Sequence, residues 1–137
     1  MKHSECICSL VAYNASLLLA HWRADTVTNE HKALGDLYEK MSDLVDDFAE
    51  VTMGKYGLVD TCSGKITTLK NPAAEGLEIV EEAQGEFTVG QDDDVLNILA
   101  DMSAALNKTA YLLKSGTTSV EEDGSDVEEF SDEEMPA

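Results

Sequence analysis

Basic residues are scarce in this sequence. It has 9 Lys and Arg against 28 Asp and Glu, which gives a formal net charge of −19 at pH 7. Nine of the acids lie between Glu121 and Glu134, and subtracting them leaves about −10 for the rest of the chain. Such a surface cannot replace the counterions of nucleic-acid phosphates, so we expect no direct DNA binding. A cation or a basic partner fits this charge better.

Cysteine and long apolar runs are also limited. Cys6, Cys8 and Cys62 are the only three cysteines, and an odd number without framework spacing argues against a disulfide scaffold and for a reducing compartment. Polar residues interrupt the apolar N-terminal stretch well short of the roughly 20 residues of a membrane span. The stretch ends in "AHWRAD", without a small-residue cleavage site. We therefore expect a cytoplasmic protein with no membrane span and no signal peptide.

The first half of the chain predicts two long helices. Ser4 can cap a helix over residues 5–23, and Thr28 can cap a second one from about residue 29 to 53, which Gly54 ends. Apolar residues recur on both at three- and four-residue steps, so each helix has one buried face. The positions expected on these faces are Ile7, Leu10, Val11, Leu17, Leu18, His21, Leu34, Tyr38, Met41, Val45 and Phe48.

The second half predicts a short helix and a third long one. Residues 56–71 are weakly patterned and could hold a short hairpin or only a loop. Pro72 begins a short helix that runs to about Ala83. The run of three Asp from residue 92 caps the third long helix, which Gly116 ends. Its apolar stripe consists of Val95, Leu99, Met102, Leu106 and Leu113.

Three long helices and one short helix, joined by loops, predict an all-α, antiparallel helical bundle. We assign residues 1–116 to this helical domain. Residues 117–137 combine low hydrophobicity with charge of one sign, so we expect them to form a disordered acidic tail. That tail could be a solubilising segment or could bind a basic protein partner.

One set of residues points to metal chemistry, because hard and borderline metal ions take carboxylate oxygens and imidazole nitrogens. Asp46 and Glu50 are four residues apart, and they follow His31 by fifteen and nineteen residues. At 100° per residue the net offsets are about 60° and 100°, so all three lie on roughly one side of the helix. Taken alone, an Asp/Glu pair is more often a solvated surface, and a histidine is more often a packing residue.

These residues cannot bind one ion within a single chain, since fifteen residues place His31 about 22 Å from Asp46 along the axis. A second, antiparallel copy would bring its His31 beside the first chain's Asp46 and Glu50. A two-fold dimer does this twice and has two equivalent sites. His21, one short loop before His31, can join the same cluster.

The stretch "AHW", followed by "HKALGDLYEKMSDLVDDFAE", resembles the Dps-type miniferritins of the ferritin-like proteins. The resemblance implies a ferritin-like bundle and an oligomer that contains at least a two-fold dimer. It also implies that iron is bound between subunits by His21, His31, Asp46 and Glu50. The implied activity is that of a ferroxidase, which oxidises iron(II) with peroxide or dioxygen for iron storage or protection from oxidative stress.

Two features depart from that family. Its further Asp, four residues after the second His, is replaced here by Gly35. There is also no fourth long helix after residue 115, so we expect that a single chain cannot close the four-helix bundle. These departures favour an alternative, in which the chain is a ferritin-like structural or interaction subunit with a vestigial metal site and an acidic tail that binds a basic partner.

Overall fold

The computed structural model describes residues 3–119, with side chains up to residue 115. It contains four helices, α1 (His3–Arg23), α2 (Asn29–Tyr56), α3 (Pro72–Gln84) and α4 (Asp93–Ser119). The prediction of an all-α chain with three long helices and one short helix is confirmed. No strand forms within residues 3–119, so the segment between α2 and α3 is a loop and not a hairpin.

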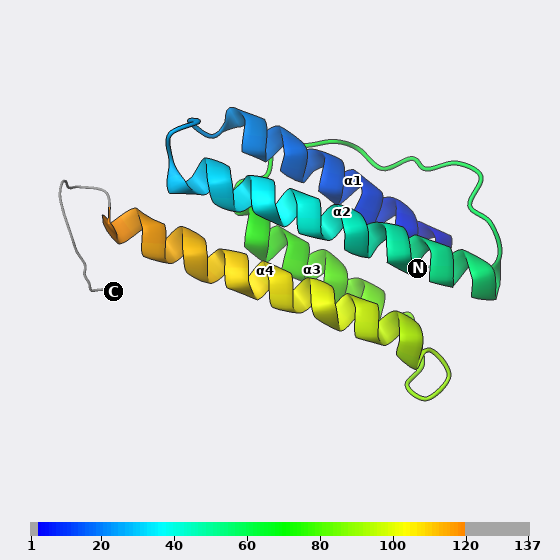
Figure 1. The fold of residues 1–137 in the computed structure, drawn as a ribbon. Helices are drawn as coiled ribbons and strands as arrows, with labels where there is room; N and C mark the ends of the chain where they lie inside the picture. The colour runs from blue at the N-terminus through cyan, green and yellow to red at the C-terminus, as the bar shows by residue number, and fades with distance from the viewer. Residues whose placement is uncertain (1–2, 120–137) are drawn as a thin grey trace.

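The helices pack as a ring of four (Figure 1). Helix α1 contacts α2 and α3, and α4 contacts the same two helices. Each contacting pair runs antiparallel, while α2 and α3 run in the same direction across the diagonal (Figure 1). The chain must therefore travel back along the bundle between them. It does so through residues 57–71, which we call the strap and which lie beside α1 (Figure 1).

The short helix α3 takes the fourth place in the ring, so the expectation that one chain cannot close the bundle is wrong. Val80 and Ala83 of α3 are buried in the core. Gly76 allows a close approach, because a Cβ there would lie 2.5 Å from the Tyr13 hydroxyl and 2.7 Å from Leu106 Cδ2. The strap makes this possible, because it returns the chain to the end of the bundle where α2 began.

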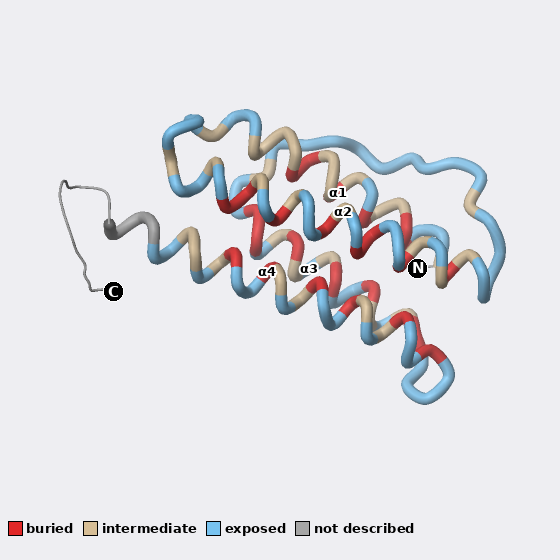
Figure 2. Tube along the Cα trace, viewed as in Figure 1, coloured by how far each residue is buried: buried red, intermediate tan, exposed pale blue. Residues whose placement is uncertain are grey.

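The core occupies the inside of the ring, where buried positions follow one face of each helix (Figure 2). Most of the predicted stripe positions are buried there, while Leu18, His21, Tyr38 and Leu113 are only partly buried. Val11 is an error of prediction, since it is 46% exposed. Ser16 is buried instead, and its hydroxyl donates to the carbonyl oxygen of Ala12. The fully buried residues of largest volume are Phe48, Leu10, Leu17, Leu34, Met41, Leu99, Met102 and Leu106.

The helix ends follow the prediction in part. Thr28 caps α2, and its side chain accepts a hydrogen bond from the His31 amide at 3.1 Å. Gly54 does not end α2, which continues to Tyr56 and stops where Gly57 takes φ 109°. Helix α4 likewise passes through Gly116 and ends at Ser119. A glycine inside a helix costs only about 1 kcal/mol relative to alanine, which neighbouring packing can outweigh.

The cysteines correct a further expectation, because Cys8 and Cys62 form a disulfide. Cys6 is buried and lies outside this bond. Among the described helices, none has the length and hydropathy needed to cross a membrane. The acidic tail and its basic partner, predicted for residues 117–137, lie outside the described residues except for the last helical positions of α4.

Candidate functional site

His21 and His31 form a pair at the turn between α1 and α2. Their rings are stacked, with centroids 4.0 Å apart and planes inclined by 28°. Each ring bonds to the main chain of the other residue: His21 Nδ1 lies 2.8 Å from the His31 carbonyl oxygen, and His31 Nδ1 lies 2.9 Å from that of His21. His21 and His31 therefore lie in direct contact, and the metal cluster predicted from them stays a prediction.

This arrangement determines which ring nitrogen is available to a ligand. A carbonyl oxygen only accepts hydrogen bonds, so each Nδ1 must carry the proton and donate. The neutral rings therefore have their lone pairs on Nε2. Among the described side chains, which end at residue 115, neither Nε2 has a hydrogen-bond partner. Metal-binding histidines commonly show this pattern, with one nitrogen held by a carbonyl and the other on the metal.

Gly35 explains how the His21 ring reaches α2. A Cβ at Gly35 would lie 2.7 Å from Cε1 and 2.9 Å from Nδ1 of His21, closer than real Cβ contacts occur. The ring therefore occupies the space that any side chain at residue 35 would need. Residue 35 is the position at which the miniferritins have a further Asp. In this chain the imidazole of His21 occupies the space that such a side chain would need.

The carboxylates Asp46 and Glu50 lie together on the outer face of α2, and both are exposed. Asp47 joins them, and one ligand oxygen from each of the three lies within 4.8 Å of the others. Sequence reasoning overlooked Asp47, although it is adjacent to Asp46. Exposed acidic groups of this kind are common without a bound ion.

The structure does not bring the imidazoles and the carboxylates together within one chain. Helix α2 is continuous from Asn29 to Tyr56, so the rise along it separates His31 from Asp46 by about 22 Å. Within one chain the imidazoles and the carboxylates are therefore two separate groups, the first at the turn between α1 and α2 and the second farther along α2.

Large aromatic side chains are exposed at the end of the bundle that holds the histidine pair. Trp22, which follows His21, is 66% exposed, and Tyr111 of α4 is 67% exposed. The side-chain amide of Asn29 donates to the Leu112 carbonyl oxygen at 2.9 Å, which fixes α4 beside this end. Trp22 is therefore a surface residue and not part of the core.

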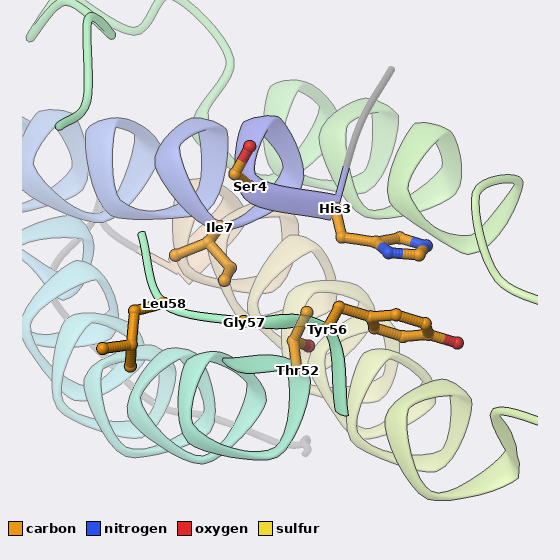
Figure 3. Close-up of a pocket in the computed structure, with 7 residues that line it drawn as sticks. All are labelled: His3, Ser4, Ile7, Thr52, Tyr56, Gly57 and Leu58. Carbon is orange, nitrogen blue, oxygen red and sulfur yellow. The ribbon is translucent and has the colours of Figure 1, made fainter. Parts of the chain in front are cut away.

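A pocket of about 470 Å³ opens at the opposite end, between the start of α1 and the end of α2 (Figure 3). The rings of His3 and Tyr56 face each other on one side of it, with centroids 4.0 Å apart. Thr52 also lines the pocket, and its buried hydroxyl oxygen has no partner among the described residues. Eighteen residues of helix, about 27 Å, separate His3 from His21, so this pocket is no part of the histidine site.

A polar cluster joins α2 to α4 near the same pocket. The buried carboxylate of Asp92 accepts hydrogen bonds from the Tyr56 hydroxyl at 2.5 Å and from the Thr88 amide at 2.9 Å. Lys55 lies 3.3 Å from Asp92 and 2.9 Å from Asp94. The Thr88 amide, and then the Tyr56 hydroxyl, hold the pKa of Asp92 below its ordinary value. This cluster fastens the end of α2 to the start of α4.

Comparison with known proteins identifies a family without a known activity. Residues 21–113 match a family of unknown function, DUF5856, and the chain belongs to it. The match begins at His21 and includes the histidine pair, the carboxylates and the strap. No curated protein and no solved structure matches the chain.

Proposed function

We propose that this protein binds iron(II) between two antiparallel copies and oxidises it, as the Dps-type miniferritins do. The observation that carries the proposal is the histidine pair, in which both Nδ1 protons are held by main-chain carbonyls and both Nε2 atoms are left for a ligand. Asp46 and Glu50 of the second copy supply the carboxylates that balance the charge of the ion.

The topology of the bundle supports a ferritin-like assignment. Neighbouring helices are antiparallel, and one long connection joins the two helices that run in the same direction (Figure 1). Four-helix bundles with a single long crossover are typical of ferritin-like folds. In this interpretation α3 and α4 are the third and fourth helices of the bundle, and α3 is strongly shortened.

The residues fit iron as a substrate. Neutral imidazoles and carboxylates suit divalent iron, and a set of three or four protein ligands leaves positions for an oxidant. Two iron(II) ions each give one electron to hydrogen peroxide, its O–O bond breaks, and two protons complete two water molecules. The chain's own part is to hold the ions and to fix the imidazoles through the two carbonyl contacts.

A mixing experiment tests the shared site directly. His21→Ala/His31→Ala and Asp46→Ala/Glu50→Ala should each abolish the growth of near-ultraviolet absorbance on addition of iron(II) and peroxide. Half of the dimers in an equal mixture contain one chain of each kind, and each of these has one intact site out of two. The mixture should therefore regain about a quarter of the wild-type rate.

Glu81→Gln, an exposed acid on α3, is the matched control and should behave as wild type. The proposal fails if the double variants oxidise iron as fast as wild type, or if mixing restores nothing. It also fails if sedimentation shows a monomer at every protein concentration with iron present.

One observation favours a second candidate function, that of a structural or interaction subunit. The His21 ring fills the space above Gly35, so the miniferritin set of ligands cannot be completed at that position. The exposed Trp22 beside it would then belong to a contact with a protein partner. This function predicts an assembly that is unchanged in Asp46→Ala/Glu50→Ala and a wild-type protein that takes up no iron.

A further inference from the structure

The strap follows one stripe of α1 through three contacts. Cys62 is bonded to Cys8, and the Thr67 amide donates to the Ser16 hydroxyl at 2.9 Å. Between them, the main chain of Gly64 lies so close to α1 that a Cβ there would be 2.8 Å from that of Ala12. The α1 residues of these contacts are Cys8, Ala12 and Ser16, which are four residues apart and share one face of the helix.

Little else holds the middle of the strap. Residues 60–68 are exposed along their whole length (Figure 2). Within the described chain, no main-chain to main-chain hydrogen bond involves residues 58–70. Val59 and Leu69, near the two ends, pack against the core. The disulfide is therefore the main attachment between these two ends.

The strap covers the junction between α1 and α3. A cavity of about 260 Å³ lies there, with Ala12 and Tyr13 of α1 on one side and Ile79 of α3 on another. Lys65 and Leu69 of the strap also line it. The pocket is already open to solvent, and movement of the strap away from α1 would remove the wall that Lys65 and Leu69 form.

The cysteines differ in access. Cys62 is exposed and Cys8 is partly buried, so reagents can reach the disulfide. Cys6 is only 1% exposed, and burial, followed by the charge of Glu86, raises the pKa of its thiol to about 11. Since the thiolate is the reactive form, Cys6 should stay inert under conditions in which the other two react.

We propose that Cys8 and Cys62 are a reversible redox site that a peroxide closes and a dithiol opens, and that its state fixes or releases the strap. The proposal does not depend on the iron site, since neither cysteine contacts the histidine pair or the carboxylates. It assigns a role to the long connection between α2 and α3, which is otherwise an exposed loop.

The closing reaction balances with one molecule of hydrogen peroxide. One thiolate attacks the peroxide, so that an S–O bond forms, the O–O bond breaks and hydroxide leaves as water after taking a proton. The second thiolate attacks the sulfenic sulfur, so that the S–S bond forms and a second water leaves. Together the two thiols lose two electrons and two protons.

Opening uses a dithiol. One of its thiolates attacks the exposed Cys62 sulfur, and Cys8 departs as a thiolate. The second thiol of the reductant then displaces Cys62 and forms a disulfide within the reductant. The dithiol is thereby oxidised, and both cysteines of the protein are reduced to thiols.

Limited trypsin digestion of the intact full-length chain tests this proposal. The cleavage site is Lys65, in the middle of the strap. Cleavage after Lys65 should be at least about tenfold faster with dithiothreitol than without, because a segment must leave the surface to enter a protease. Adding peroxide to the reduced chain after removal of the dithiol should restore slow cleavage. Mass shifts after alkylation should show two thiols lost for each peroxide consumed.

Variants separate the strap from general unfolding. Cys62→Ser should be cleaved quickly at Lys65 without reductant and should not respond to dithiothreitol, while Cys6→Ser should respond as wild type does. Cleavage at Lys40, inside α2, should stay equally slow in every sample and so report an intact bundle. Equal cleavage at Lys65 in the oxidised and reduced chains overturns the proposal. So does peroxide treatment that leaves both thiols open to alkylation.

Discussion

Gly35 shows how one absent side chain decides the contact between two helices. The sequence indicated this position only as a departure from the miniferritin pattern. The structure shows that the His21 ring lies where a Cβ would be. That contact depends on how α1 crosses α2, which residue spacing does not reveal, and so its role could not be predicted. The spacing did indicate that His21 and His31 could meet, because one short loop separates them.

We expect Gly35→Ala to separate metal binding from stability. Alanine gains about 1 kcal/mol over glycine inside a helix, and displacing the His21 ring loses a hydrogen bond worth about 1 kcal/mol. The free energy of unfolding should therefore change by less than about 1 kcal/mol, measured by urea denaturation. Cobalt(II), titrated by its visible absorbance, should bind at least about tenfold more weakly, because the paired imidazoles come apart.

Gly54→Ala is the matched control, since a Cβ there meets nothing within 4 Å. This variant should gain about 1 kcal/mol in stability and keep the cobalt affinity of wild type. Unchanged cobalt binding in Gly35→Ala would show that the ring position has no part in the site.

Asp92 gives a prediction for acid stability. Its pKa is lowered in the folded chain, first by the Thr88 amide and then by the Tyr56 hydroxyl. A lowered folded pKa means that the ionised carboxylate adds stability above the ordinary carboxyl range, and that this part is lost as the pH falls through the folded value. Asp92→Asn should therefore be less stable than wild type at pH 7, and the difference should shrink at about pH 3.

Urea denaturation at the two pH values measures both differences. Asp60→Asn, on the exposed strap, should track the wild-type profile. If the loss of unfolding free energy in Asp92→Asn is as large in acid as at neutral pH, the hydrogen-bond geometry, and not the charge, stabilises the fold at this position.

At the scale of helices, the sequence predicted existence and type better than ends. Periodic apolar residues located all four helices because burial of one face is a local property of spacing. Thr28 marked its cap correctly, since the acceptor and the His31 amide are only three residues apart. The predictions that Gly54 and Gly116 end their helices were wrong, because a glycine ends a helix only where the chain must turn. In α2 that turn comes at Gly57, which has a positive φ.

Replacement of Thr28 tests the cap that begins α2. Thr28→Ala should lower the free energy of unfolding by about 1 kcal/mol, because the His31 amide loses its acceptor at the helix end. Thr28→Ser keeps the acceptor and should recover most of that loss. Equal stability of the alanine and serine variants, measured by chemical denaturation, would show that water satisfies the amide equally well.

At the scale of the whole molecule, two features escaped the sequence for one reason. The place of α3 as the fourth member of the ring, and the pairing of Cys8 with Cys62, both depend on the path of the strap along α1. The strap has no periodic pattern, so nothing local predicts its direction. The helix count therefore suggested an open bundle, and the odd number of cysteines suggested a reduced chain. The path of fifteen loop residues instead gives a closed bundle with a covalent link.

That link should stabilise the chain mainly by restricting its unfolded state. The bonded cysteines are 54 residues apart, and closing a loop of that length corresponds to about 4 kcal/mol in the chain-entropy treatment. Cys8→Ser/Cys62→Ser should therefore lose about 2–4 kcal/mol of unfolding free energy while its helical circular dichroism stays unchanged. Dithiothreitol should produce the same loss in wild type and none in the double variant. Neither Cys8 nor Cys62 belongs to the buried core. A weaker helical circular dichroism signal of the double variant without denaturant would therefore mean that the strap positions α3 as well as covering it.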